Sequence, residues 1–213
     1  MDRNISIIGA GTYGEVVKEL VEILGYTVEA FYDDDNEKIG KYIDGVLVAG
    51  RIELEDIIKS KNEYVIAIGN NQLRKSLGES IKKKGANLPT LIHPKATISP
   101  SAKIGEGCII HANSYIWTKV NINSFSIISP NTLLAHHTVI GEGGFVSSGA
   151  NIGAGINFGS CVFIGIGATI MTGVVKLGDN CIIGAGSTVI KDVDANQVVA
   201  GVPAKIIRTI TSK

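Results

Sequence analysis

The stretch from Ile98 to Ile170, written in groups of six residues, reads ISPSAK IGEGCI IHANSY IWTKVN INSFSI ISPNTL LAHHTV IGEGGF VSSGAN IGAGIN FGSCVF IGIGAT I. The first residue of each group is large and apolar, and the fifth is usually small or β-branched. After Ile170 the period slips by one residue and resumes at Leu177, Ile183 and Val189. Because a helix repeats its apolar face at about 3.6 residues and a strand at about 2, a period of six fits neither element alone.

This period predicts a parallel β-helix, in which each group forms one short strand and a corner, and three groups complete a coil. The apolar residues of successive coils stack inward, and glycine or asparagine takes corners that need a positive φ. Because no coil buries its apolar face alone, only the stack is stable. We therefore expect residues 94–213 to form an all-β domain of this kind.

Residues 1–93 carry a different pattern. A strand-like run over residues 4–8 leads directly into Gly9-Ala-Gly-Thr-Tyr-Gly14, which is followed by a helical pattern to about Leu24 and a second strand-like run, Thr27–Tyr32. Three acids follow this run, at residues 33–35. In this context the glycines let the backbone approach a pyrophosphate at a helix N-terminus, and an acid can bond a ribose hydroxyl. An α/β Rossmann-like domain is therefore predicted, with further elements at Val46–Ala49, Ile52–Lys59, Tyr64–Ile68 and Leu73–Lys84.

Taken alone, the glycine fingerprint suggests NAD. The unit is short, however, and lacks a second mononucleotide half to hold the nicotinamide end. An NAD-dependent oxidoreductase therefore remains the weakest of the alternatives.

Composition narrows the function classes. The chain has 213 residues, zero formal net charge and three cysteines, so neither a nucleic-acid nor an anionic-membrane partner is expected. An odd number of lone thiols favours a reducing compartment. No run approaches the ~20 apolar residues of a membrane span, and no signal peptide is evident. We expect a soluble, cytoplasmic protein.

With the six-residue repeat placed after the glycine turn, the whole chain resembles the bacterial nucleotide-sugar acetyltransferases of the hexapeptide acyltransferase family. Members N-acetylate UDP- or dTDP-linked 4-amino sugars, and sialic acid O-acetyltransferases are their close relatives. The resemblance implies a left-handed parallel β-helix after the Rossmann-like domain. It also implies acetyl-CoA as co-substrate, no metal, and a homotrimer whose active sites lie between neighbouring subunits.

For the first domain, the resemblance implies that residues 1–93 bind the nucleotide of the sugar substrate. The positions that correspond to the family's nucleotide-sugar contacts are Gly11, Thr12, Tyr13, Asp33, Asp34, Gly69 and Asn70.

Two adjacent histidines, His136 and His137, fall in the middle of a group, where side chains point outward. Two outward histidines on a rigid corner have no packing reason to be there, which favours a general base. The resemblance places the family's catalytic histidine on His136. Relatives usually follow it with a carboxylate, whereas this chain has His137, and Glu142 is the nearest alternative acid. Relatives also place an asparagine where this chain has Ser129, which weakens the assignment of the acceptor.

Because one coil is three groups, Ala154 is predicted to lie directly above His136, where its N–H could receive an oxyanion. The family's oxyanion position also maps to Ala154. The same arithmetic stacks Asn131, Gly149, Gly167 and, after the slip, Gly186 into a column that could form a groove for a pantetheine arm. The resemblance implies CoA contacts at Phe145, Ile166 and Ala185, with Pro203 and Lys205 near the adenine end. The first of these is a histidine in relatives, and phenylalanine cannot make its hydrogen bond. By position, Gly155 beside Ala154 and Gly167 of the column are further candidates for CoA binding.

The leading hypothesis is an acetyl-CoA-dependent N-acetyltransferase acting on the 4-amino group of a UDP- or dTDP-linked 4-amino-6-deoxy sugar, for surface glycan synthesis. A sugar O-acetyltransferase of the sialic acid type is the enzymatic alternative. A non-catalytic β-helix protein that only binds a nucleotide or a partner is the third.

Overall fold

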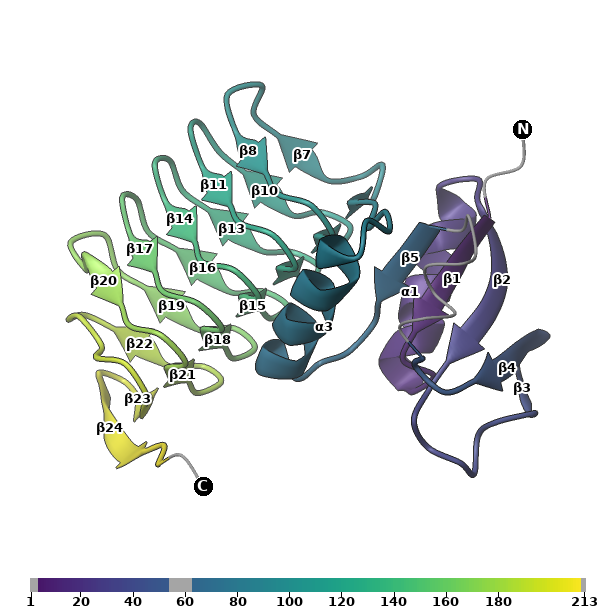
Figure 1. Ribbon diagram of the computed structural model, residues 1–213. Coiled ribbons are helices and arrows are strands. Elements are labelled where there is room, and N and C mark those ends of the chain that lie inside the picture. Colours follow the sequence, from purple (N-terminus) through teal and green to yellow (C-terminus); the bar gives the residue numbers. More distant parts are fainter. Residues whose placement is uncertain (1–3, 54–62, 212–213) are drawn as a thin grey trace. The chain divides into compact units, whose positions relative to one another are not determined.

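The computed structural model describes residues 4–53 and 63–211, and the chain divides into two compact units, Met1–His93 and Pro94–Lys213 (Figure 1). Each unit is described by itself. The helix expected at Ile52–Lys59 falls largely outside the described residues.

The first unit is an α/β fold with a five-stranded sheet in the order β3-β4-β2-β1-β5. Its pairings are parallel except for β3 with β4, which form an antiparallel hairpin through Asp44 and Gly45, both at positive φ. Most predicted elements are present within one to three residues of the expected bounds. The elements are β1 (Asn4–Ile8), α1 (Thr12–Ile23), β2 (Thr27–Tyr32), β3 (Tyr42–Ile43), β4 (Val46–Gly50), β5 (Glu63–Ile66) and α3 (Asn71–Lys83). The strand β6 (Leu91–Ile92) belongs instead to the eight-stranded sheet of the β-helix.

The second unit is a parallel β-helix with three faces, which we name by order. The first face holds β7 (Thr97–Ile98), β10 (Tyr115–Ile116), β13 (Leu133–Leu134), β16 (Asn151–Ile152), β19 (Thr169–Ile170) and β22 (Thr188–Val189). The second face holds β8 (Lys103–Ile104), β11 (Asn121–Ile122), β14 (Val139–Ile140), β17 (Asn157–Phe158) and β20 (Lys176–Leu177). The third face holds β9 (Ile109–Ile110), β12 (Ile127–Ile128), β15 (Phe145–Val146), β18 (Phe163–Ile164), β21 (Ile182–Ile183) and β23 (Gln197–Gly201). The β-strand β24 (Ala204–Thr209) completes the third face.

The predicted inward stack is present. Strands pair with those 18 residues away, as Leu134 does with Ile116 and Ile152, so each aliphatic side chain lies over its equivalent. The stacked residues are fully buried in the middle coils, for example Ile128, Leu134 and Ile140. The prediction of an α/β part followed by a left-handed parallel β-helix is thus confirmed.

Corners follow the same period. A residue with positive φ recurs every sixth position from Gly107 to Gly173, and then at Asn180 and Gly186 after the slip. Most are glycine or asparagine, but His137 and Cys161 also adopt this conformation. The slip itself is a one-residue bulge at residues 171–175, where Thr172 and Val174 form a bridge around Gly173.

The chain does not leave the β-helix as a simple tail. The strand β23 pairs parallel with β21, and β24 then turns back and pairs antiparallel with β23. The six-residue repeat ends at Val189, so it predicts neither of these strands. The adjacent apolar residues Ile206 and Ile207 of β24 are both exposed, so β24 lacks the alternation of apolar and polar residues by which a strand is recognised.

Candidate active site

His136 and His137 lie on the corner between β13 and β14, which we call the histidine corner with its equivalents on other coils, residues 117–120, 153–156 and 171–175. Both side chains are exposed, as expected. Their Nδ1 atoms lie 3.0 Å apart, so one ring donates and the other accepts. If His136 carries the Nδ1 hydrogen, its Nε2 lone pair faces outward and is available to a substrate.

The backbone fixes this pair. His137 has φ of 62°, a conformation in which histidine is tolerated better than most residues, and its N–H donates to the Thr118 carbonyl at 3.0 Å. The Gly155 N–H donates to the His136 carbonyl, also at 3.0 Å. The histidine pair is therefore held from the coil below and from the coil above.

Trp117 is a neighbour of His136 that the sequence analysis missed. Its ring centroid lies 5.4 Å from that of His136, with the planes at 73°, and Tyr115 lies 6.4 Å from Trp117. A signal was present in the repeat. The second residue of the other groups between Ile98 and Ile170 is Ser, Gly, Asn, Ala or His, and only Trp117 is large and apolar there.

Ala154 occupies the coil above His136, where the 18-residue spacing puts it. Its N–H donates to Oγ1 of Thr172, 3.2 Å away on the next coil. An acyl oxygen must therefore replace this hydroxyl to use the same donor.

The structure contains the predicted column of glycines, but on a different corner from His136. Asn131, Gly149, Gly167 and Gly186 all have positive φ and form the corner between the third and first faces, which we call the glycine corner. A Cβ added at Gly167 or Gly186 would meet open space. Strand β13 of the first face lies between Asn131 and His136, so one face of the β-helix separates the two corners.

The other expected CoA contacts are dispersed in a single chain. Ile166, 66% exposed, and Ala185, also exposed, flank the glycine corner. Phe145 lies on the third face, with its ring 5.4 Å from that of Phe163. Gly155 lies on the histidine corner and has φ of 72°.

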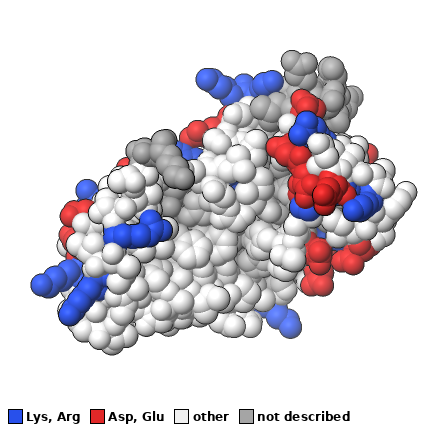
Figure 2. All heavy atoms as spheres, turned by 90° about the horizontal axis from the view of Figure 1, so that it is seen from below, with Lys and Arg blue, Asp and Glu red and all other residues white. Residues whose placement is uncertain are grey.

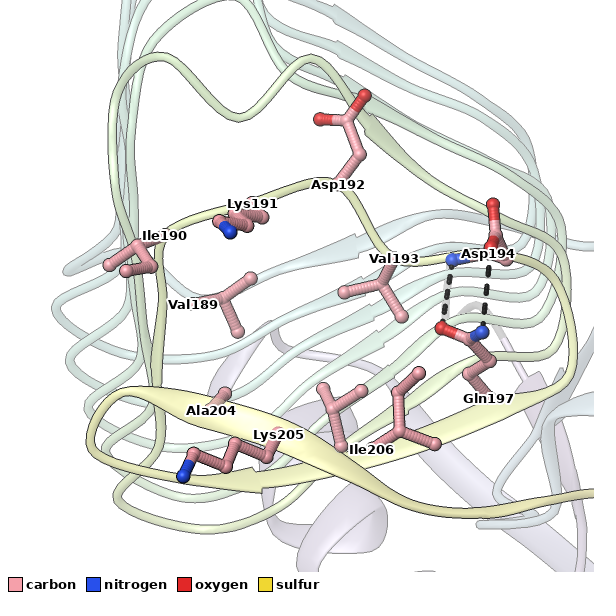
Figure 3. Close-up of a pocket in the computed structure, with 11 residues that line it drawn as sticks. Val189, Ile190, Lys191, Asp192, Val193, Asp194, Gln197, Ala204, Lys205 and Ile206 are labelled. Atoms are coloured by element: carbon pink, nitrogen blue, oxygen red, sulfur yellow. Dashed lines mark hydrogen bonds between the residues drawn. The ribbon is translucent and has the colours of Figure 1, made fainter.

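Pro203 and Lys205 belong to the C-terminal hairpin. Lys205 borders a cavity of about 340 Å³ between the last coil and β24, and Figure 3 shows the apolar side chains of Val189, Val193 and Ile206 turned into it (Figure 3). Lys191, Asp192 and Asp194 stand at its rim. Pro203 does not line this cavity.

In the first unit, the three glycines of the fingerprint have distinct surroundings. A Cβ at Gly9 would lie 2.6 Å from the Ala67 carbonyl oxygen, and one at Gly14 would collide with the Gly9 carbonyl. A Cβ at Gly11 would meet nothing within 4 Å. Gly9 and Gly14 thus serve close backbone packing, and Gly11, followed by Thr12 and Tyr13 at the start of α1, is the open position at the helix N-terminus.

The carboxylates of both predicted acids, Asp33 and Asp34, accept hydrogen bonds from backbone N–H groups. The Asp33 carboxylate accepts from Ala10 N (2.8 Å), Asp35 N (2.9 Å) and Lys38 Nζ (3.1 Å). Burial raises the pKa of this carboxyl, but these hydrogen bonds outweigh burial and hold the pKa below its usual value. Asp34 Oδ1 accepts from Ile52 N at 3.2 Å. The acids therefore shape the loop beside Gly11 in addition to any ligand contact.

Arg74, which the sequence did not indicate as a site residue, binds the backbone of the loop that contains Gly69 and Asn70. Its buried guanidinium donates to the carbonyls of Ile68 (2.8 Å) and Gly69 (3.4 Å) and to Asn71 Oδ1 (2.9 Å). Asn70 caps α3 by accepting from Leu73 N at 3.0 Å. Burial raises the pKa of the Tyr13 hydroxyl far above its usual value, and the nearby Arg74 charge opposes this.

Several other features bear on the chemistry. A cavity of about 470 Å³, which contains none of the predicted site residues, is lined by Ser101, Lys103, Lys119, Val120 and Asn121.

Within residues 4–53 and 63–211, no group of three or more His, Cys, Asp and Glu side chains could hold a metal ion, and no helix there is long and apolar enough to cross a membrane. The three cysteines are free and buried. Burial, with a contribution from Asp179, raises the pKa of the Cys181 thiol to about 12, which makes it a poor nucleophile.

Comparisons with known proteins agree with this architecture. Residues 4–81 match the family described as PglD N-terminal domain. The chain is 37% identical to UDP-N-acetylbacillosamine N-acetyltransferase of Bacillus subtilis over 113 residues, which span 52% of each chain. The structure of PerB from Caulobacter crescentus in complex with CoA and GDP-perosamine is similar with a TM-score of 0.88 and 32% identity, over 95% of this chain and 96% of that one. The acetyltransferase domain of PglB from Neisseria gonorrhoeae has a TM-score of 0.88 and 31% identity, over 97% of this chain and 100% of that one.

Proposed function

Because the chain belongs to the family of hexapeptide-repeat acetyltransferases of nucleotide-linked amino sugars, we propose that it transfers the acetyl group of acetyl-CoA to the 4-amino group of a nucleotide-linked 4-amino-6-deoxy sugar. The expected nucleotide is UDP or dTDP, and the likeness to PerB adds GDP as a third candidate. The product serves surface glycan synthesis. The observation that carries the proposal is an exposed imidazole, His136, one coil below the amide of Ala154 on the same corner.

His136 is the proposed general base. With its Nδ1–H donated to His137, its Nε2 accepts the proton that the substrate nitrogen sheds while a C–N bond forms to the thioester carbonyl carbon. When the tetrahedral intermediate collapses, the C–S bond breaks and the CoA sulfur takes that proton from His136. His137 orients the base in place of the carboxylate found in relatives. It supplies an acceptor without a negative charge.

The Ala154 N–H is the proposed donor to the oxyanion of that intermediate. A backbone amide held between two coils is preorganised, so it stabilises developing charge without moving. In the structure Thr172 Oγ1 takes this hydrogen bond, and binding of the thioester replaces the hydroxyl with the acyl oxygen.

Each unit supplies one substrate site. Gly11, Thr12, Tyr13, Gly69 and Asn70 line the two loops at the helix N-termini of α1 and α3, which suit the nucleotide, with Asp33 and Asp34 beside them. The glycine corner, with Ile166, Gly167 and Ala185, suits the pantetheine arm.

Basic side chains at the C-terminal end of the β-helix could bind the phosphates of CoA. Lys205 and Arg208 of β24 are exposed, and Figure 2 shows Lys and Arg side chains at the C-terminal end of the β-helix (Figure 2). We propose that Pro203 and Lys205 lie beside the adenine end of CoA.

The separation of the two corners supports a homotrimer in which the glycine corner of one copy faces the histidine corner of the next. In such a trimer, one CoA molecule would contact Phe145 of one copy and Gly155 of the neighbouring copy. Light scattering coupled to gel filtration tests this assembly, and a monomer that is fully active contradicts it. Three free cysteines also fit a cytoplasmic location.

A thiol-release assay tests the activity. Acetyl-CoA is offered with UDP-, dTDP- and GDP-linked 4-amino-6-deoxy sugars and with matched sugars that carry a hydroxyl at the same carbon. Release with the amines alone supports N-acetylation, and release with the hydroxyl series supports the O-acetyltransferase alternative.

The variant His136→Ala provides the mechanistic control. It is expected to bind CoA as the parent does and to lose at least about 100-fold in rate, the low end of general-base contributions. A rate near that of the parent removes His136 from the mechanism.

A further inference from the structure

Four rings follow one another on the surface of the β-helix, in the order Tyr115, Trp117, His136 and His137. Trp117 is the single tryptophan of the chain, and it is 44% exposed, as is Tyr115. The chain of rings therefore presents aromatic surface to solvent directly beside the proposed base.

Packing of the β-helix does not require this tryptophan. The inward position of its strand is filled by Ile116, which is 1% exposed, and Trp117 follows it at the outward start of the corner. Equivalent positions one coil above and two coils above hold Ala135 and Gly153. Later coils of the same column carry exposed Met171 and Ile190, so Trp117 is the large side chain of the column on the coil next to His136. It changes the surface there and leaves the core as it was.

The order of residues along the histidine corner indicates which substrate the indole meets. Trp117 lies one coil below His136, whereas Ala154 lies one coil above it and Thr172 above that. If the thioester oxygen is received by Ala154, the acyl donor lies on the side of higher residue numbers. The attacking amine then approaches His136 from the side of Trp117.

We propose that Trp117, flanked by Tyr115, is the platform on which the amino-sugar ring of the acceptor rests, with its amine directed to His136. This inference rests on the proposed function. The C–H face of a pyranose and the methyl group of a 6-deoxy sugar are apolar, and an exposed indole offers them a large, rigid surface. Trp117 thereby selects for a deoxy sugar and holds its ring without a charge or a hydrogen bond.

Kinetics of Trp117→Ala and Trp117→Phe test the platform, with both substrates varied. Trp117→Ala is expected to raise KM for the acceptor roughly tenfold, the cost of exposing about 60 Å² of apolar sugar surface, with kcat and KM for acetyl-CoA within about twofold of the parent. Trp117→Phe retains an aromatic face and is expected to recover most of the affinity. Ile23→Ala, which removes an exposed apolar side chain at the last turn of α1, serves as the matched control.

The single tryptophan also provides a direct signal. We expect the UDP-, dTDP- or GDP-linked 4-amino-6-deoxy sugar that the enzyme acetylates to change the fluorescence of Trp117, and the matching free nucleoside diphosphate to leave it unchanged. Unchanged acceptor KM in Trp117→Ala, or a fall in kcat alone, overturns the platform while leaving acetyl transfer intact. Absence of transfer by the parent with every acceptor instead overturns the proposed function, and the platform falls with it.

Discussion

Ala154 and Thr172 are joined across two coils by a hydrogen bond of 3.2 Å, from the amide N–H of the first to the hydroxyl of the second. Because the acyl oxygen must compete with this hydroxyl, Thr172→Val is expected to tighten acetyl-CoA binding. A hydrogen bond of about 1 kcal/mol corresponds to a change of about fivefold. Calorimetric titration with acetyl-CoA measures it. Thr172→Ser keeps the hydroxyl and should bind as the parent does, while weaker binding by Thr172→Val would mean that the hydroxyl donates to the ligand.

His137 is predicted to act through His136. At φ of 62° asparagine is well tolerated, as Asn131 and Asn180 show at equivalent positions, so His137→Asn should fold normally. Weakening one hydrogen bond to the base is expected to lower kcat about tenfold at unchanged KM. His137→Asp restores the carboxylate of relatives and should keep kcat within a few fold of the parent. Equal kcat in the asparagine variant would exclude an orienting role.

The glycine corner can take a side chain without backbone strain. Gly167 has φ of 65° and open space where a Cβ would lie, so Gly167→Asn is accepted by the backbone. Its side chain is expected to raise KM for acetyl-CoA at least about tenfold and to leave the melting temperature and the acceptor KM unchanged. Gly143→Asn makes the same change at a third corner, with φ of 65°, and should have no such effect. Equal behaviour of the two variants would place CoA elsewhere.

Acid is predicted to remove a specific contribution to stability. The hydrogen bonds that hold the pKa of Asp33 below its usual value stabilise the fold at neutral pH. Since the folded pKa lies below the unfolded value of about 3.9, this stabilisation is present above that value and is lost as pH falls through the folded pKa. Asp33→Asn should therefore be less stable than the parent at pH 7 by about 1 kcal/mol, and the difference should close as pH falls below the pKa of the unfolded carboxyl. Glu37→Gln, on an exposed side chain, should match the parent throughout.

The architecture could be predicted from the sequence because one signal is repeated on every coil. The period of six marks the inward residues, and its threefold multiple sets the register that puts Ala154 over His136. The same arithmetic already separates Asn131 from His136, by five positions of an 18-residue coil, and so assigns the glycine column to another corner.

What could not be predicted depends on side-chain direction and on single elements. The contact between Trp117 and His136 joins two coils, and only the corner geometry brings the rings to 5.4 Å. The strand β24 occurs once, pairs antiparallel and exposes Ile206 and Ile207, so it has no repeat to reveal it. The hydrogen bonds of Asp33 and Arg74 to loop backbone likewise follow from the tertiary fold and not from local pattern.

The antiparallel direction of β24 affects whether another chain can add strands to the end of the β-helix. Identical parallel rungs are a template onto which another chain could add its own strand, extending the array end to end as in a fibre. Here the outermost strand of one face runs against the others and carries Lys205 and Arg208 on an exposed edge. A strand added at this edge would not continue the parallel array and would pair beside two solvated cations. The hairpin therefore covers one of the three faces at the C-terminal end of the stack against such addition.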